Sequence, residues 1–585
     1  MSLHARRPSR KGFQPEASPN LLPQDDYELE SISSHGTGHG LADKFSLSPD
    51  PTNWGSNLSL NHPEPDDYLH NPTMEGGKVV DRSSSSKFTR RGIANIGCLV
   101  ILSLGLVGLF LGYPVATFVN RTFLTNKPTT SSAANATALP AFVNFGLIDA
   151  DTPAEARTIT SLVTGKEMKL VFSDEFETDG RSFYPGDDPY WEAVDLHYWS
   201  TNNMEWYDPA GVTTGGGALR ITLSAQETHN LSYQGGLVTT WNKFCFTGGL
   251  IVTNATLPGK NNIHGLWPAF WTMGNLGRAG YGASLDGMWP YTYDSCDVGT
   301  APNQTLNGLP EISRTSGDTN PKNPFNGELS YQPGQRLSRC TCPGESHPGP
   351  IHEDKTYVGR SAPEIDVFEA QIADNLGGGA VSQSGQWAPF NAGYVWPNTS
   401  DNFAIADLNA SFFNTYIGGA YQQATSVVTK TNQDCYELEG GCATVYGLEY
   451  KPGFDDAYIQ WITDNKVAWT IQAAGLGPDP QTEIAARPVP QEPMYILANL
   501  GMSGNFGNVD LEHLTFPTTL SLEYVRVYQY ADSINIGCDP PDFPTQAYIN
   551  TYLEAYTNPL LTTWVDDYNQ TIPKNSWLGE CSLPT

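Results

Sequence analysis

Three acidic residues within six positions are the part of the sequence most suited to catalysis. They are Glu364, Asp366 and Glu369, and the residues between them are apolar (Glu364-Ile-Asp-Val-Phe-Glu369). Crowded carboxyl groups raise the pKa of at least one member, so one stays protonated near neutral pH while another is ionised. Cleavage of a glycosidic bond uses this difference, because one carboxylate attacks the anomeric carbon and one carboxylic acid protonates the leaving oxygen.

The geometry of a β-strand decides whether these three side chains can act together. In a regular strand, Glu364 and Asp366 point to one face and Glu369 points to the other. One β-bulge between Asp366 and Glu369 returns all three to the same face. We therefore predict a bulge at this place; the alternative is an edge strand that is merely acidic on its solvent side.

Short strands are also expected in the rest of the chain beyond about residue 165. The whole chain has 57 Gly, 43 Pro, 11% aromatic residues and only 16% charged residues, which favours strands and turns over long helices. Its net charge of -30 argues against a nucleic-acid partner, whose phosphates require Lys and Arg.

Segments with the pattern of strands are Lys169–Ser173, Ala218–Leu223, Tyr458–Thr463, Val467–Ile471 and Leu520–Tyr524. Asp464-Asn465 predicts a hairpin between the third and the fourth. After the fifth, the apolar phase slips at Val525 and Val527, which indicates a strand covered on both faces. Two sheets packed face to face would use these strands, and the Gly/Pro-rich stretches 275–360 and 420–447 are predicted loops.

An apolar segment ahead of this region predicts one membrane crossing. No charged residue lies between Gly92 and Asn120, and about 20 apolar residues suffice to span a bilayer. Basic residues are frequent just before the segment and sparse after it, so the N-terminus is expected in the cytosol. We predict a single-pass type II protein of the secretory pathway, in the endoplasmic reticulum, the Golgi or the plasma membrane.

The predicted organisation follows from these boundaries. It comprises a disordered cytosolic tail over 1–90, a transmembrane helix over 92–119, a stalk over 120–164, a β-sandwich over 165–531 and a cysteine-containing extension over 532–585. Seven sequons beyond the span predict glycosylation in the lumen, at Asn135, Asn230, Asn254, Asn303, Asn398, Asn409 and Asn569.

Cysteine usage agrees with an oxidising compartment. Eight of the nine cysteines follow the span and allow up to four disulfides: Cys245, Cys296, Cys340, Cys342, Cys435, Cys442, Cys538 and Cys581. We predict the pairs Cys435–Cys442 and Cys538–Cys581, because each would close a loop or tie down the tail. Cys340-Thr341-Cys342 has no second pair of ligands near it, so we predict neither a metal site nor a cofactor.

Several stretches resemble the family 16 glycoside hydrolases. Glu364-Ile-Asp-Val-Phe-Glu369 is similar to the signature E-x-D-x-x-E in the bulged form of laminarinase-like members. The stretches 170–176, 266–271 and 516–529 resemble the opening strand, the aromatic segment before the active site and the closing strand of that family. The layout and the segment 281–296 resemble more closely the fungal β-glucan synthesis-associated proteins, which act in β-1,6-glucan and cell-wall assembly.

The resemblance implies a concanavalin-like β-sandwich (jelly roll) and a role for each acid. Glu364 would be the nucleophile and Glu369 the general acid/base, with Asp366 hydrogen-bonding to Glu364, and the reaction would retain the anomeric configuration. The tryptophans expected to contact sugar are Trp267 and Trp271, for which core packing is the alternative, and also Trp289 and Trp387. Laminarinase-like members carry a His shortly after the cluster, where this chain has Gln386; a Gln can hydrogen-bond but cannot carry a proton.

The expected function is that of a membrane-anchored glycosidase or transglycosidase acting on β-glucan. One alternative is a catalytically weak glucan-binding scaffold or assembly factor. Another is a folding factor of the early secretory pathway, which would bind glycoprotein glycans. The expected partners are β-glucan and, through one span, the lipid bilayer.

Overall fold

The computed structural model describes residues 74–75, 78–79, 103, 146–319 and 325–581. Residues from 146 onward belong to one compact unit, whereas β1 (Met74–Glu75) and β2 (Lys78–Val79) pair with each other in a second unit. Most of the predicted tail, and the predicted span except Ser103, lie outside the described residues. Within the described part of the chain, no helix is both long and apolar enough to cross a bilayer.

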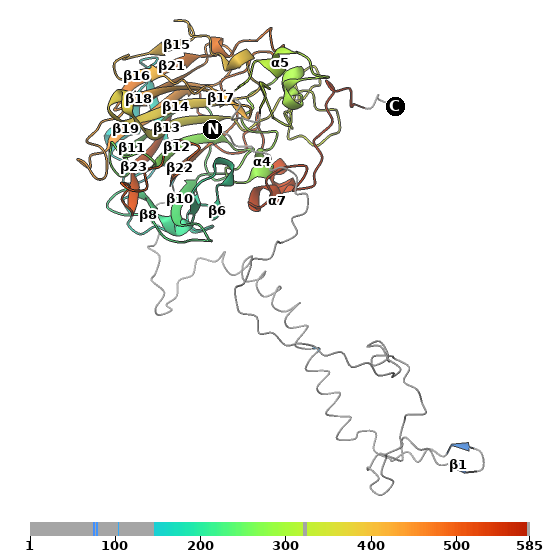
Figure 1. Cartoon of the computed structure of the whole chain (residues 1–585), viewed down its shortest axis with the longest axis horizontal. Coiled ribbons are helices and arrows are strands. Elements are labelled where there is room, and N and C mark those ends of the chain that lie inside the picture. The colour runs from blue at the N-terminus through green and yellow to red at the C-terminus, as the bar shows by residue number, and fades with distance from the viewer. Residues whose placement is uncertain (1–73, 76–77, 80–102, 104–145, 320–324, 582–585) are drawn as a thin grey trace, which may run out of the picture. The chain divides into compact units, whose positions relative to one another are not determined.

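Two large β-sheets packed face to face form the main unit and confirm the predicted all-β sandwich (Figure 1). The sheet that carries the acidic cluster is called here the cleft sheet. Its path of paired strands is β16 (Ser411–Phe413), β18 (Gln422–Lys430), β14 (Gly378–Trp387), β13 (Glu364–Ala373), β12 (Trp267–Gly274), β22 (Met494–Gly501), β10 (Tyr233–Thr239), β7 (Glu205–Tyr207) and β6 (Leu196–His197), with β17 (Gly418–Gly419) on β18 and β5 (Glu192–Ala193) on β10.

The second sheet, called here the back sheet, contains most of the strands predicted from the sequence. Its path is β15 (Phe403–Ile405), β21 (Lys466–Gln472), β20 (Tyr458–Thr463), β19 (Thr444–Lys451), β11 (Gly249–Thr256), β23 (Thr518–Gln529), β4 (Glu167–Asp174) and β3 (Thr158–Thr160), with β9 (Leu219–Leu223) on β23 and β8 (Val212–Thr214) on β9. Asp464 and Asn465 have φ of 53° and 57° and join β20 to β21, as a two-residue hairpin turn requires.

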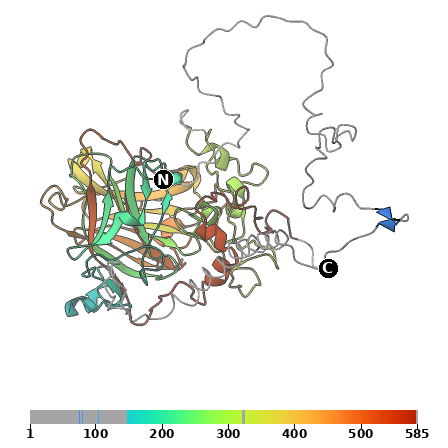
Figure 2. The ribbon, with the colours of Figure 1, turned by 90° about the horizontal axis from the view of Figure 1, so that it is seen from below.

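Helices are few and short. The α-helices are α4 (Gly282–Leu285), α5 (Ile312–Thr315), α6 (Gln546–Thr551) and α7 (Leu553–Thr557). The 3-10 helices are η5 (Ala154–Arg157), η6 (Trp199–Thr201), η7 (Pro209–Gly211), η8 (Val298–Thr300), η9 (Pro302–Gln304), η10 (Asp374–Leu376), η11 (Ala392–Tyr394) and η12 (Ala473–Leu476). Figure 2 shows the C-terminal helices, in red, beside the two sheets.

The phase slip in β23 has a different cause from the one predicted. Asn254 of β11 pairs with Tyr524, but the next residue of β11 pairs with Leu522, so Glu523 is an extra residue. The bulge returns Val525 and Val527 to the same core as Leu522. The bulge accounts for the phase slip. The predicted cover on both faces holds only near the end of the strand, where Tyr528 is buried in a second hydrophobic cluster with Met168 and Leu170, whereas Glu523 is exposed.

Two other sequence predictions need correction. The stretch 420–447 is not all loop, since it contains β18 and the start of β19; the polar run of β18 lies buried among neighbouring strands. The folded unit also begins before residue 165. Ile148 bridges to Ser173, and β3 pairs with β4, so the end of the predicted stalk is part of the sandwich.

Four disulfides are present in the main unit, two of them between cysteines more than 200 residues apart. Cys435–Cys442 confirms one predicted pair, and Cys296–Cys340 lies within the loops between β12 and β13. The predicted pair Cys538–Cys581 is wrong: Cys538 bonds to Cys245, and Cys581 bonds to Cys342. The C-terminal extension is thus tied to the sandwich at two points and does not form a separate loop.

The predicted glycosylation sites differ in their access to solvent. Asn230, Asn398, Asn409 and Asn569 are exposed, Asn254 and Asn303 are half-buried, and Asn135 lies outside the described residues. Glycosylation itself remains a prediction.

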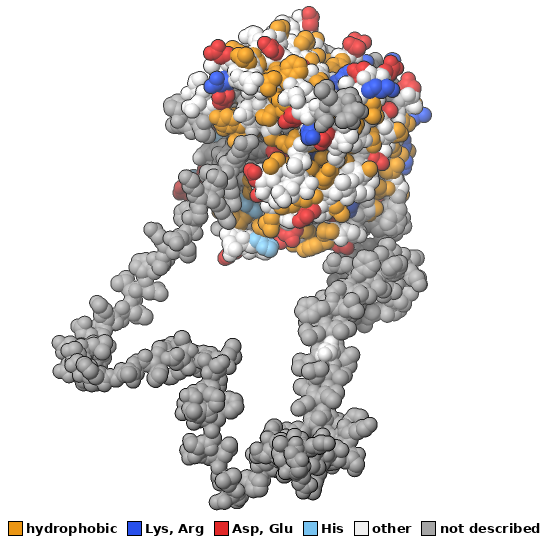
Figure 3. Space-filling model, turned by 90° about the vertical axis from the view of Figure 1, so that its right-hand side faces the viewer, with side chains coloured by type: hydrophobic (Ala, Val, Ile, Leu, Met, Phe, Trp, Pro, Cys, Tyr) orange, Lys and Arg blue, Asp and Glu red, His pale blue; other side chains and the backbone are white. Residues whose placement is uncertain are grey.

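Charged side chains of both signs are scattered over the face of the molecule that Figure 3 shows, with no basic patch on that face.

Candidate active site

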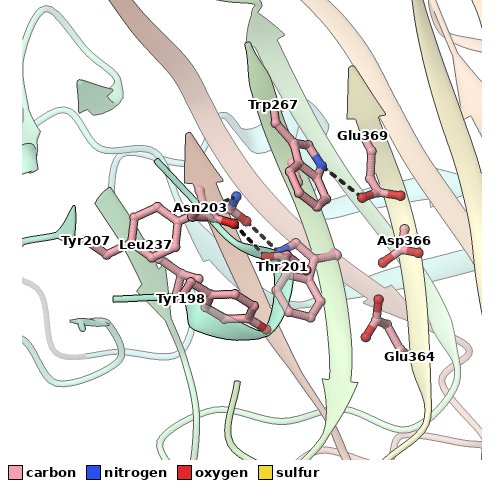
Figure 4. Close-up of a pocket in the computed structure, with 12 residues that line it drawn as sticks. Tyr198, Thr201, Asn203, Tyr207, Leu237, Trp267, Glu364, Asp366 and Glu369 are labelled. Carbon is pink, nitrogen blue, oxygen red and sulfur yellow. Dashed lines mark hydrogen bonds between the residues drawn. The ribbon is translucent and has the colours of Figure 1, made fainter. Parts of the chain in front are cut away.

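The bulge predicted within the acidic cluster is present in β13. On one side, Asp366 pairs with Ser384 and Glu369 with Ser382 of β14. The step from Asp366 to Glu369 is three residues long on β13 but only two on β14, so β13 contains one extra residue. The register between β13 and β12 also shifts, between Phe270 and Trp271 of β12. The extra residue returns Glu369 to the face that carries Glu364 and Asp366, and Figure 4 shows the three carboxyl groups along one side of a pocket.

The pocket has about 420 Å³ of empty space above the cleft sheet. Its lining comprises Tyr198, Thr201, Asn203, Tyr207, Leu237, Trp267, Ala269, Trp271, Glu364, Asp366, Glu369 and Asn499. The three acids are nearly inaccessible, with exposed fractions of 2%, 1% and 5% in chain order. Carboxyl groups that are so buried require hydrogen-bond partners.

Each carboxyl group has a specific donor. The Trp289 indole donates to Glu364 Oε2 over 2.6 Å, and the Trp267 indole donates to Glu369 Oε1 over 3.0 Å. Asp366 Oδ2 accepts from Ser384 Oγ (2.6 Å) and Gln386 Nε2 (3.0 Å). These hydrogen bonds fix the orientations of the three carboxyl groups.

Burial raises the pKa of all three acids. The pKa of Glu364 lies well above its ordinary value because of burial first, and then because of the charges of Asp366 and Glu369. Burial also raises the pKa of Asp366, against the hydrogen bonds from Ser384 and Gln386. The pKa of Glu369 rises to about 8, through burial and then the charge of Asp366.

These shifts have a chemical consequence. At neutral pH Glu369 is protonated and can act as an acid. Glu364 and Asp366 are joined by a hydrogen bond between their carboxyl groups, which needs one proton. This hydrogen bond raises the pKa of Glu364 and lowers that of Asp366, so Glu364 is the member of the pair that holds the proton.

The predicted tryptophans have three different positions. Trp267 and Trp271 line the pocket, and the Trp271 indole donates to Asn499 Oδ1 over 2.8 Å. Trp289 is fully buried and contacts the site through Glu364. Trp387 lies in the core between the sheets, so its predicted role in sugar binding is wrong. It follows Gln386 in β14, and adjacent residues of a strand point to opposite faces.

Sequence reasoning missed the wall opposite the acids. Asn203 Nδ2 donates to Glu205 Oε1 (2.6 Å) and to the Tyr207 hydroxyl (2.9 Å), which also accepts from Asn499 Nδ2 (3.1 Å). Thr201 donates to Asn203 Oδ1. The amides of this wall offer hydrogen-bonding groups to a sugar (Figure 4). The only signal in the sequence was a run of polar and aromatic residues over 198–207.

We expect the raised pKa of Glu369 to make the fold less stable as the pH rises. Its pKa is about 8 when folded, against an ordinary 4.5. Between these values the folded protein binds a proton that the unfolded chain has lost, so the free energy of unfolding falls from pH 4.5 to 8. Glu369→Gln should therefore have a higher Tm than the wild type at pH 8, with little difference at pH 4. Thermal unfolding at both pH values, with the exposed Glu227→Gln as control, tests this; equal Tm values at pH 8 would contradict it.

Comparison with known proteins relates this site to a family. The family profile described as "Beta-glucan synthesis-associated protein SKN1/KRE6/Sbg1" matches residues 56–581. The β-glucan synthesis-associated protein KRE6 of Saccharomyces cerevisiae is 40% identical over 534 residues, covering 90% of this chain and 70% of that protein. The protein SKN1 of Candida albicans is 37% identical over 584 residues, covering 98% and 72%.

More distant similarities involve glucanases. The endo-1,3-1,4-β-glycanase EglC of Rhizobium meliloti is 28% identical over 185 residues, covering 27% of this chain and 37% of that enzyme. Among solved structures, the endo-1,3-β-glucanase (laminarinase) catalytic domain from Thermotoga petrophila RKU-1 is 16% identical, with a TM-score of 0.36, covering 62% of this chain and 98% of that one. The endo-β-1,3-glucanase from Pyrococcus furiosus has a TM-score of 0.35, 17% identity and coverage of 64% and 98%. Such TM-scores are too low to support a functional inference.

Proposed function

Because this chain belongs to the SKN1/KRE6/Sbg1 family of β-glucan synthesis-associated proteins, we propose that it acts on β-glucan as a retaining glycosidase or transglycosidase. The observation that carries this proposal is the arrangement of Glu364, Asp366 and Glu369 on one face of a bulged strand, beside a pocket. Two carboxyl groups with different tasks are what glycosidic cleavage requires.

The first half of the reaction would form a covalent intermediate. The Glu364 carboxylate attacks the anomeric carbon, and the bond to the leaving oxygen breaks as Glu369 gives that oxygen its proton. Before this step the proton shared with Glu364 must lie on Asp366. Ser384 and Gln386 hold Asp366 in place for that exchange.

The second half would release the sugar. Glu369, now ionised, takes a proton from an acceptor hydroxyl while the acceptor oxygen bonds to the anomeric carbon and the bond to Glu364 breaks. Water as acceptor gives hydrolysis, and a sugar hydroxyl gives transfer. Both outcomes retain the anomeric configuration, since the anomeric carbon is inverted twice.

The location is part of the proposal. We propose a type II membrane protein of the secretory pathway whose sandwich lies in the lumen or outside the cell. The charge distribution around residues 92–119 supports this orientation. Four disulfides and exposed sequons fit an oxidising compartment that glycosylates proteins.

The test is to incubate the full-length chain with β-1,3- and β-1,6-gluco-oligosaccharides and to follow their lengths. Shorter products indicate hydrolysis, and longer products indicate transfer. NMR of the first product should show the β-anomer before mutarotation. An α-anomer would overturn the retaining mechanism, and unchanged oligosaccharides would overturn the catalytic proposal.

A glucan-binding scaffold is the second candidate function. The observation that favours it is that burial raises the pKa of Glu364 well above its ordinary value, whereas a nucleophile must be ionised. This function predicts that oligosaccharides bind without being converted. Binding measured by calorimetry, with no change in length, would select it.

A further inference from the structure

An aromatic pair stands beside the proposed acid/base. The ring of Phe506 lies parallel to the indole of Trp267, with an angle of 1° between the planes and 4.3 Å between the centroids. The same indole lines the pocket and donates to Glu369 Oε1. Trp267 therefore has one contact that orients its ring and another that orients the carboxyl group.

The register of the strands locates this pair within the site. Ala269 of β12 pairs with Glu369 of β13, and Met273 pairs with Glu364. Trp267 precedes Ala269 by two residues on the same face, so it lies beyond Glu369 on the side away from Glu364. In the proposed reaction, the leaving group and the acceptor must approach Glu369. Proton transfer therefore takes place on the side of the pocket where Trp267 lies.

Phe506 lies in the connection from β22 to β23, at a part of it that is exposed to solvent. Gly504, Asn505 and Gly507 are exposed, while Phe506 is half-buried. The Phe506 N–H donates to the carbonyl of Ser503 over 3.1 Å. The Ser503 hydroxyl donates to the carbonyl of Thr201, which belongs to the opposite wall of the pocket.

We propose that Phe506 is a positioning residue that orients Trp267 and, through its indole N–H, the carboxyl group of Glu369. The proposal rests on the proposed function, in which Glu369 is the acid/base. In this proposal, the connection from β22 to β23 holds the two walls of the pocket relative to each other. Ser503 at its start hydrogen-bonds to Thr201 of one wall, and Phe506 packs on Trp267 of the other. Phe506 does not belong to the core between the sheets, so its ring can be removed without opening that core.

The activity test compares two substrates in Phe506→Ala. We expect kcat/KM to fall about tenfold on an unactivated β-gluco-oligosaccharide, whose leaving oxygen needs a proton. On a dinitrophenyl glycoside, whose leaving group needs none, kcat/KM should stay within about twofold of the wild type. Phe506→Tyr should restore the lost activity, and Leu511→Ala, which removes an exposed side chain from the same connection, should behave as the wild type. Equal losses on both substrates would overturn the proposal.

A second measurement does not depend on activity. In the full-length chain with ¹⁵N-labelled tryptophan, the Trp267 indole resonance is identified by its absence in Trp267→Phe. Its proton should exchange with water at least about tenfold faster in Phe506→Ala than in the wild type, as expected when a hydrogen bond is lost. An unchanged exchange rate would overturn the proposal. If the wild type converts neither substrate, the proposed function fails, and the exchange rate still decides whether Phe506 orients Trp267.

Discussion

Glu364→Gln is expected to lower kcat/KM on β-gluco-oligosaccharides by about 10³-fold, the order of effect for an essential catalytic group. Gln has the size of Glu and can still accept the hydrogen bond from the Trp289 indole. It cannot attack the anomeric carbon, so only the nucleophile is lost. Initial rates of the wild type and the variant, measured by the release of reducing ends, provide the check. Activity within tenfold of the wild type would exclude Glu364 as the nucleophile.

Azide can separate the roles of the two glutamates. In Glu364→Ala, azide has room to attack the anomeric carbon directly and should give an α-glycosyl azide. In Glu369→Ala, the covalent intermediate still forms from an activated substrate, and azide should give a β-glycosyl azide. The same anomer from both variants would contradict the assigned roles. Asp366→Asn serves as a comparison, because it removes the group that shares a proton with Glu364 but neither of the two reacting groups.

Glu492→Gln is expected to destabilise the fold by about 3–5 kcal/mol, the usual cost of leaving one member of a buried ion pair without its partner. Arg360 Nε and Nη2 donate to the two oxygens of Glu492 over 2.8 and 2.7 Å, and the side chains are 0% and 3% exposed. Arg360 also donates to the carbonyls of Gly349 and Pro544. The pair therefore joins the loops before β13, the C-terminal extension and the start of β22. Denaturant unfolding, followed by tryptophan fluorescence, measures the loss.

A surface ion pair provides the matched control. Arg314 and Glu328 are 3.6 Å apart and 54% and 25% exposed, so Glu328→Gln should cost at most about 1 kcal/mol. Similar losses in Glu328→Gln and Glu492→Gln would mean that burial of the ion pair does not determine its effect. A double variant in which Met replaces Arg360 and Leu replaces Glu492 should recover part of the stability, since it leaves no unpaired charge.

The acidic face of the site could be predicted because it depends on local rules. Alternation along a strand placed Glu364 and Asp366 together, and one bulge was the simplest way to add Glu369. The same rule would have excluded Trp387, which follows a residue already assigned to the site. The resemblance to a family suggested four tryptophans as a group, whereas the structure separates lining, supporting and core positions.

The opposite wall could not be predicted from the sequence, because its contacts are non-local. Asn203 and Asn499 come from segments almost 300 residues apart and meet at the hydroxyl of Tyr207. Nothing in either segment indicates the other. The disulfides of Cys538 and Cys581 were mispredicted for a related reason, since two cysteines close together in sequence were assumed to pair within the tail.

The connectivity of these disulfides has a consequence for synthesis. In the proposed lumenal location, Cys245 enters the lumen 293 residues before its partner Cys538, and Cys342 enters 239 residues before Cys581. During that interval Cys296 and Cys340 are nearer oxidation partners, so trapped non-native bonds are expected. Maturation of the folded unit should then depend on a thiol isomerase and be complete only after Cys581 has been synthesised. A chain terminated before Cys538 would leave Cys245 and Cys342 without their partners and open to attack by quality-control factors.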